Sequence, residues 1–291
     1  SVRLESDTGA WLVRVGCPGI RFSVGPRGAV VWNATCCPVS MARGATWDPD
    51  VEGRGGHAIG RELRAVGASL TGAVCVNLLR HPAWGRAQET YGEDPHHVGE
   101  LGAAFTRGLQ RHVMACVKHF ACNSMENARF TVDVEVDEVA LHEVYLPHFR
   151  RIIDEGAASV MSAYNSVNGE WCGHSRELLT DVLRGEWGFE GFVISDWVFG
   201  VREAAASLNA GLDIEMPARM VRSQHLADAL ERGEASWADV DRSVERVDDH
   251  AAEHGIDGVQ AILEGGDDAE VGPCAAPAPG LGAGTGHAPT A

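Results

Sequence analysis

The sequence predicts an α/β protein whose strands form a (β/α)8 TIM-type barrel, either regular or irregular and incomplete, within a single domain. Short apolar runs alternate with amphipathic segments along the chain, which is typical of βα units. The runs do not alternate polar with apolar residues, as expected for parallel strands buried on both faces. About 250 residues in one domain favour a barrel. An open doubly wound sheet is the alternative, although no GxGxxG or Walker loop follows any run.

Five apolar runs are the expected strands. They cover residues 72–79, 113–117, 158–163, 191–194 and 212–214, and they are brief and rich in branched residues. The carboxyl ends of parallel barrel strands meet at one end of the barrel. We therefore expect the polar residues that follow these runs to lie close together.

Helices are expected between the runs, and their ends are marked in the sequence. Asp48-Pro49 and Asp94-Pro95 each place a capping side chain before a proline at the first helical position. Gly67, Gly108 and Gly156 stand near the expected far ends.

One expected helix, from Glu138 to Glu155, contains Pro147. A proline inside a helix removes a backbone hydrogen bond and clashes with the preceding turn. This helix should be kinked or split in two.

The barrel domain is expected to span residues 1–264, followed by a tail over residues 265–291. In the tail, 18 of 27 residues are Gly, Ala or Pro. Such a composition buries too little surface to offset its ordering entropy, so we predict a disordered tail.

Charge and composition exclude several classes of function. The 24 basic and 41 acidic residues give a formal net charge of −17, which repels phosphate backbones and anionic lipid. No apolar run reaches the length of a membrane span, and the chain does not open with a secretory signal pattern. Partners among nucleic acids and membranes are therefore not expected.

The eight cysteines contain no CxxC pair, and Cys75 and Cys116 lie within apolar runs. Thiols packed in a core fit a reducing compartment, so we expect a cytoplasmic protein. No His/Asp/Glu cluster has metal-ligand spacing. Neither a metal nor another cofactor is expected.

Candidate site residues, most of them polar, lie within or just after the ends of all five runs: Arg80, His81, Arg86 and Glu89; Lys118, His119, Asn123, Glu126 and Arg129; Tyr164 and Asn165; Ser195, Asp196 and Trp197; Asp213, Glu215 and Met216. Convergent charges with aromatic rings suit a sugar, whose hydroxyls need donors and acceptors. Structural roles are the alternative: an Asp after a strand is often a helix cap, Lys118-His119 could be a core pair, and Arg86 with Glu89 could be a loop ion pair. These residues alone indicate a barrel enzyme acting on a polar small molecule.

Five longer motifs resemble the N-terminal barrel domain of glycoside hydrolase family 3, the β-glucosidase type. They are Gly85-Arg86 with Glu89-Thr-Tyr-Gly-Glu-Asp-Pro95, Val117-Lys-His-Phe120, Val160-Met-Ser-Ala-Tyr-Asn165, Gly191-Phe-Val-Ile-Ser-Asp-Trp197 and Ala210-Gly-Leu-Asp-Ile-Glu-Met-Pro217. The resemblance covers roughly residues 17–250. A barrel of unrelated chemistry would require five motifs to occur in order by chance.

The resemblance implies retaining hydrolysis of a small β-glucoside or oligosaccharide by two carboxyl groups. It makes Asp196 the nucleophile, ionised through a low pKa that cations such as Lys118 and Arg129 would favour. It also implies that the sugar hydroxyls bind Arg86, Lys118, His119 and Arg129, that Tyr164 lies beside the nucleophile, and that Trp197 stacks on the sugar.

The chain departs from the family pattern in two respects, a sugar-binding residue and the source of the general acid. Val24-Gly25-Pro26 stands where the family has Asp-Gly-Pro, whose Asp binds sugar hydroxyls. The family's glucosidases take their general acid from a following α/β domain, and the tail stands there instead. The loop that carries a histidine acid in the glucosaminidase branch is replaced by Ala121-Cys122-Asn123.

The sequence therefore leaves two hypotheses for the function. The first is a weakened β-glucosidase-like glycosidase. The second is a non-catalytic or vestigial sugar-binding barrel, a fragment of a glycosidase. A partner domain or a homo-oligomer could complete either one.

Overall fold

The computed structural model describes residues 6–7, 20–31, 33–218 and 220–254. The predicted tail and the first part of the predicted domain lie outside these ranges, as do Cys17 and Cys274. None of the helices in the described ranges combines the length and apolarity needed to cross a bilayer.

The main sheet has six strands in the order β1-β2-β3-β4-β6-β9. Their bounds are Ser6–Asp7, Arg21–Ser23, Leu70–Cys75, Met114–Phe120, Ser159–Ser162 and Phe192–Ile194. Only the short β1 runs antiparallel to its neighbour, and each later pair is parallel. This confirms the α/β fold with a parallel sheet.

The sheet curls into a partial, TIM-barrel-like cylinder. The ring of Phe22 on β2 lies 4.6 Å from the ring of Trp197, which follows β9. Because β3, β4 and β6 lie between β2 and β9 in the sheet order, this contact requires the sheet to curl. Beyond β9 the described sheet continues only as one parallel bridge between Ile194 and Ile214. The expectation of a strand over residues 212–214 was wrong. Within the described residues the barrel is incomplete.

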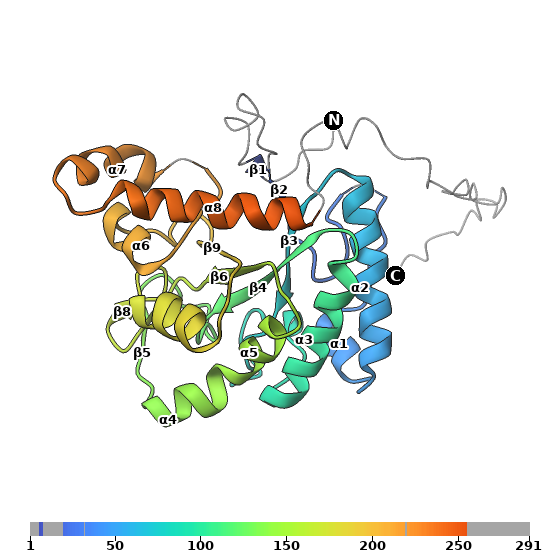
Figure 1. Ribbon diagram of the computed structural model, residues 1–291. Coiled ribbons are helices and arrows are strands. Elements are labelled where there is room, and N and C mark those ends of the chain that lie inside the picture. Colours follow the sequence, from blue (N-terminus) through green and yellow to red (C-terminus); the bar gives the residue numbers. More distant parts are fainter. Residues whose placement is uncertain (1–5, 8–19, 32, 219, 255–291) are drawn as a thin grey trace, which may run out of the picture.

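The described part of the chain also contains helices, most of which lie outside the curled sheet. They are α1 (Ser40–Gly44), α2 (Pro49–Ala65), α3 (Pro95–Leu109), α4 (Glu138–Ala140), α5 (Pro147–Ile153), α6 (Ala204–Ala210), α7 (Val221–Glu231) and α8 (Trp237–Glu253), with the 3-10 turn η2 (Ala87–Glu89) and the π-helical segments η3 (Leu141–Tyr145) and η4 (Glu177–Glu186). Figure 1 shows α2, α3 and α5 side by side on one face, while α8 crosses the ends of the strands. A second small sheet joins β5 (Asp133–Val134), β7 (Ser166–Val167) and β8 (Glu170–Trp171).

The predicted helix signals are largely confirmed. The side chains of Asp48 and Asp94 accept backbone hydrogen bonds at the starts of α2 and α3. Pro147 opens α5, so the expected long helix is split. Gly67, just past α2, has a φ of 83°, a region that favours glycine. Gly108 instead lies inside α3, where a Cβ would collide with the backbone of α2.

The apolar core has two main parts. One lies between the sheet and its covering helices and includes Leu63, Phe105 and Phe149. The other fills the inside of the curled sheet, where residues from the first positions of the strands, such as Leu70 and Met114, pack together. Ala251 and Val247 of α8 pack against this inner cluster. Thus α8 covers the amino ends of the strands and does not cover their carboxyl ends, where the predicted site residues lie.

The Asp213 carboxylate links α8 to the sheet. It accepts hydrogen bonds from the backbone of Val193 at 2.8 Å, from Arg184 of η4 at 2.8 Å and from Arg246 of α8 at 2.9 Å. Its side chain is fully buried, and the Arg184 side chain is 12% exposed. Removing the carboxylate would leave buried guanidinium charge without a counterion.

We therefore expect Asp213→Ala to lower the free energy of unfolding by about 3–5 kcal/mol. Urea denaturation would measure this. The matched control is Asp181→Ala, which removes an exposed carboxylate 3.6 Å from Arg176 and should cost less than about 1 kcal/mol. Equal losses in the two variants would show that the Asp213 network does not hold the fold together.

Candidate active site

The alternation of side chains along the strands places two charged residues inside the curled sheet. In β4, Cys116 belongs to the inner cluster, and Lys118 two residues later faces the same side. In β9, Ile194 belongs to the same cluster, and Asp196 follows two residues later. Lys118 is 5% exposed and Asp196 is 6% exposed. Both charges are buried above the apolar floor of the sheet, at the carboxyl ends of its strands.

Arg86 and His119 lie beside Asp196 in a continuous polar row. The guanidinium of Arg86 makes a bidentate ion pair with Glu89, at 2.9 and 2.7 Å. Its Nη1 lies 2.8 Å from Nε2 of His119, and that Nε2 lies 3.5 Å from Oδ2 of Asp196. The predicted loop ion pair is therefore present, and its guanidinium also contacts His119.

The charge states in this row follow from burial and from the neighbouring cations. Burial lowers the pKa of His119 well below its usual value, and the charges of Arg86, Lys118 and Arg129 lower it further. His119 is neutral at neutral pH, so its contact with Asp196 is not an ion pair. Burial raises the pKa of Glu89, but the hydrogen bond from Arg86 and the charges of Arg86 and Lys118 together outweigh burial and leave the pKa below its ordinary value.

The two oxygens of the Asp196 carboxylate have different surroundings. Oδ1 accepts the backbone N–H of Trp197 at 2.7 Å. Oδ2 is buried and has no hydrogen-bond partner within the described part of the chain. One oxygen is thus held in place, and the other is left with free lone pairs.

The expectation of a low pKa for Asp196 was wrong. Burial raises the pKa of this carboxyl group above its ordinary value. The N–H of Trp197, the charges of Lys118 and Arg86 and the nearby hydroxyl of Tyr164 lower it, but together they do not outweigh burial. The sequence showed the cations but could not show how completely the carboxylate is removed from water.

The ammonium group of Lys118 makes no hydrogen bond or ion pair with any described residue. It lies next to Gly72 on β3. A Cβ at Gly72 would lie 3.5 Å from Nζ of Lys118, an ordinary contact distance, but it would collide with the ring of Phe22, so the glycine leaves space for Phe22. A buried ammonium group whose three N–H donors have no partner among the described residues is suited to binding oxygen atoms of a ligand.

Tyr164 and Arg129 form the next part of the wall. The hydroxyl of Tyr164 donates to the carbonyl oxygen of Trp197 at 2.7 Å, and burial raises the pKa of this phenol, as does the charge of Asp196. The guanidinium of Arg129 lies 4.9 Å from the centre of the Tyr164 ring and 3.0 Å from Glu126. All seven residues predicted for the site therefore lie around one end of the sheet.

Two residues predicted to follow the last strand are used elsewhere. Asp213 holds Arg184 and Arg246, as described above. The carboxylate of Glu215 accepts the backbone N–H groups of residues 220–222 at the start of α7. These acidic groups stabilise the fold and do not join the row around Asp196.

Sequence reasoning missed two residues that support the site. Asn77 makes hydrogen bonds to the backbone of His119, at 2.9 and 2.8 Å. The indole N–H of Trp84 donates to Glu126 at 3.0 Å. The signal for Asn77 was present, because an amide inside the apolar run 72–79 requires hydrogen-bond partners when buried.

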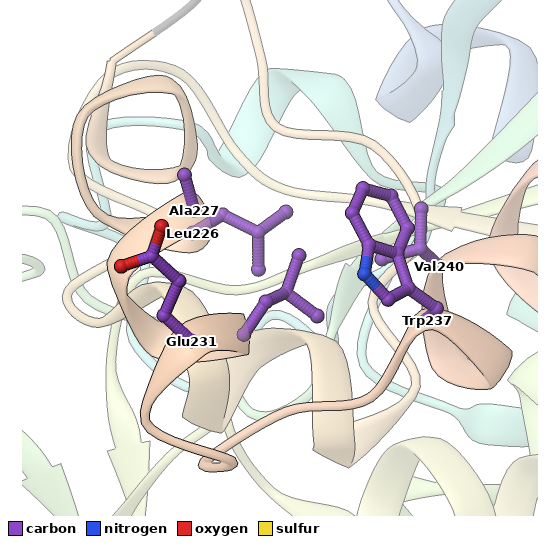
Figure 2. Close-up of a pocket in the computed structure, with 6 residues that line it drawn as sticks. Leu226, Ala227, Glu231, Trp237 and Val240 are labelled. Atoms are coloured by element: carbon purple, nitrogen blue, oxygen red, sulfur yellow. The ribbon is translucent and has the colours of Figure 1, made fainter.

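No group of three or more His, Cys, Asp or Glu side chains in the described ranges could hold a metal ion. A separate hollow of about 530 Å³ lies between α7 and the start of α8 (Figure 2). It is lined by Leu226, Ala227, Leu230, Glu231, Trp237 and Val240. With one carboxylate among apolar side chains, it lacks the many donors and acceptors that a sugar needs. The polar row around Asp196 is therefore the candidate active site.

Comparisons with known proteins show the family to which this chain is related. The family model described as "Glycosyl hydrolase family 3 N terminal domain" matches residues 23–249. A beta-glucosidase of Rhizobium radiobacter is 40% identical over 260 residues, covering 84% of this chain and 32% of that protein. The thermostable beta-glucosidase B of Acetivibrio thermocellus is 38% identical over 250 residues, covering 80% of this chain and 33% of its own length.

Solved structures show the same likeness. Beta-glucosidase 3B from Thermotoga neapolitana, in complex with glucose, superposes with a TM-score of 0.78 at 36% identity, covering 82% of this chain and 36% of that one. The beta-glucosidase DesR from Streptomyces venezuelae, in complex with D-glucose, gives a TM-score of 0.79 at 35% identity, covering 84% of this chain and 33% of that one. The chain spans about a third of the length of the relatives it matches.

Proposed function

The chain belongs to glycosyl hydrolase family 3, and from that premise we propose that it carries the sugar-binding cup and the nucleophile of a β-glucosidase-like retaining glycosidase. Its substrates in this proposal are small β-glucosides or oligosaccharides. One observation carries the proposal. Oδ2 of Asp196 is buried beside Arg86 and Lys118 and has no hydrogen-bond partner within the described part of the chain.

The free oxygen defines the chemical step. Oδ2 of Asp196 attacks the anomeric carbon, and the bond from that carbon to the aglycone oxygen breaks, so the aglycone leaves with the electron pair. The result is a sugar bound through an ester to Asp196. Water then attacks the same carbon, which releases the sugar and restores the carboxylate.

The surrounding residues bind and orient the sugar in this proposal. Lys118 offers free N–H donors to hydroxyl oxygens, and Arg86 and Arg129 add further donors. His119 lies between Arg86 and the nucleophile. In this proposal its ring borders the bound sugar. The Tyr164 hydroxyl, held by the carbonyl of Trp197, stays close to the anomeric centre, where positive charge develops. Trp197 presents its ring to the apolar face of the sugar.

The acid that protonates the leaving oxygen is the missing part. Glu89 is bound to Arg86, and Glu126 accepts from both Trp84 and Arg129. Among the described residues these two carboxylates are committed to their cations, so a partner domain would supply the acid. The same observation favours the second candidate, a sugar-binding barrel without turnover.

Hydrolysis of aryl β-glucosides separates the two candidates. A nitrophenolate leaves without much help from an acid, so an enzyme with only a nucleophile should still release it. We expect nitrophenol release from nitrophenyl β-glucoside and much slower cleavage of an alkyl β-glucoside. Binding of gluconolactone without any nitrophenol release would establish the non-catalytic alternative.

A further inference from the structure

The side chain of Asn77 makes three contacts with His119. Oδ1 of Asn77 accepts the backbone N–H of His119 at 2.9 Å, and its Nδ2 donates to the backbone carbonyl of His119 at 2.8 Å. These two bonds fix which end of the amide is oxygen, because a peptide N–H can only donate and a carbonyl can only accept. The same Oδ1 lies 3.2 Å from Nδ1 of the imidazole ring. Asn77 is 2% exposed and His119 is 1% exposed.

The two ring nitrogens of His119 face opposite requirements. Nδ1 faces an amide oxygen, which is an acceptor, so Nδ1 must carry the proton to make a hydrogen bond. Nε2 faces Nη1 of Arg86 at 2.8 Å, and a guanidinium group has donors only. Nε2 must therefore offer its lone pair. Both contacts select the same neutral tautomer.

We propose that Asn77 is a positioning residue that fixes His119 as the Nδ1–H tautomer and so keeps the nucleophilic oxygen of Asp196 free. This inference rests on the proposed function of Asp196. Nε2 lies 3.5 Å from Oδ2 of Asp196. A proton on Nε2 would be donated to that oxygen and would oppose Arg86, whereas a lone pair on Nε2 leaves the oxygen able to attack carbon.

Four charged groups face His119: the guanidinium groups of Arg86 and Arg129, the ammonium of Lys118 and the carboxylate of Asp196. The three cations favour a neutral ring, whereas the carboxylate alone would favour a protonated one. Burial and the three cations lower the pKa of His119, so the ring is neutral near neutral pH and exists as one of its two tautomers.

Imidazole 15N NMR of the whole chain reads the tautomer directly. The signals of His119 are those missing from the spectrum of His119→Gln. In the parent we expect a protonated Nδ1 and an unprotonated Nε2 that do not titrate between about pH 5 and 8, where an ordinary histidine would. A protonated Nε2 in the parent would overturn the proposal without any need for a variant.

Two substitutions then test the role of Asn77. Asn77→Ala removes the acceptor, and we expect the ring to populate the Nε2–H tautomer, with kcat for nitrophenyl β-glucoside reduced roughly tenfold or more. Asn77→Asp keeps the acceptor but adds negative charge, and we expect His119 to titrate at a higher pH and the pH profile of kcat/KM to change with it. An unchanged tautomer in Asn77→Ala would contradict the proposal.

Asn165→Ala is the matched control. Asn165 is also buried, and its amide donates to the carbonyls of Ala121 and Ser166. It should lower stability by a similar amount while leaving the His119 signals unchanged. If the tautomer shifts as expected but no variant or parent hydrolyses glucosides, the positioning inference stands and the proposed function fails.

Discussion

Asp196→Ala is expected to reduce kcat for nitrophenyl β-glucoside by a factor on the order of 10⁴ or more, because loss of a nucleophile removes the covalent route entirely. The substitution removes the oxygen that has no other partner in the described structure. It also leaves the N–H of Trp197 without its acceptor, which costs about 1–3 kcal/mol of stability. The loss of activity should therefore greatly exceed any loss of fold.

Azide provides a positive test of the same variant. A small anion can enter the space left by the carboxylate and attack the anomeric carbon, giving a glucosyl azide of inverted configuration. Asp181→Asn, at an exposed aspartate, should keep the parent rate. Parent-like hydrolysis by Asp196→Ala would show that another group is the nucleophile.

Asp196→Asn should also be at least as stable as the parent at pH 7. The pKa of Asp196 is raised in the folded state, so the folded chain holds this proton more tightly than the unfolded chain. Stability falls as pH rises from the unfolded pKa through the folded pKa, and the loss persists above it. A neutral amide avoids that loss, and thermal melts at pH 4 and pH 7 would show a smaller decrease for the variant.

Val24→Asp is expected to tighten the binding of glucose or gluconolactone by roughly tenfold or more, since a charge-assisted hydrogen bond contributes about 1.5–3 kcal/mol. The structure gives the residue a suitable place. Val24 follows β2 directly, and it shares the inner side of the sheet with Phe22, two residues earlier. The pairing of Ser23 with Thr71 puts Val24 level with Gly72, whose Cβ position lies 3.5 Å from Nζ of Lys118. A carboxylate there would meet a free ammonium group.

Isothermal titration of both forms would measure the gain. Val24→Asn is the matched control, because it has the same shape without the charge, and it should gain less. Turnover should rise less than binding, since the acid is still not supplied by the described residues. Equal affinities of Val24→Asp and the parent would place the sugar elsewhere, and the assignment of the cup would fail with it.

Much of the fold could be predicted because its signals are local. Four of the five apolar runs overlap strands, and the caps at Asp48 and Asp94 and the break at Pro147 depend on a few adjacent residues. The run 212–214 failed because a single bridge to Ile194 replaces a strand. Whether a run forms a ladder depends on its neighbours in space, and so does the degree of curvature that leaves the described barrel incomplete.

The site was predicted only in part for the same reason. The sequence motifs predicted Arg86, His119 and Asp196 as site residues, and the structure brings these three into contact range. Asn77 was missed because its partner is 42 residues away along the chain. The raised pKa of Asp196 was missed because burial depends on the whole fold and not on the cations that the sequence displays.

The central claim is that Asp196 forms a covalent bond to the sugar, and trapping tests it most directly. A dinitrophenyl glucoside with fluorine at carbon 2 reacts in the first step, but hydrolysis of the resulting ester is slow. After incubation with the whole chain, intact-mass analysis should show one added fluoroglucosyl group, and peptide mapping should place it on Asp196. Asp196→Ala should remain unmodified. No added mass in the parent, under conditions where gluconolactone binds, or a label on any other residue, would contradict the account.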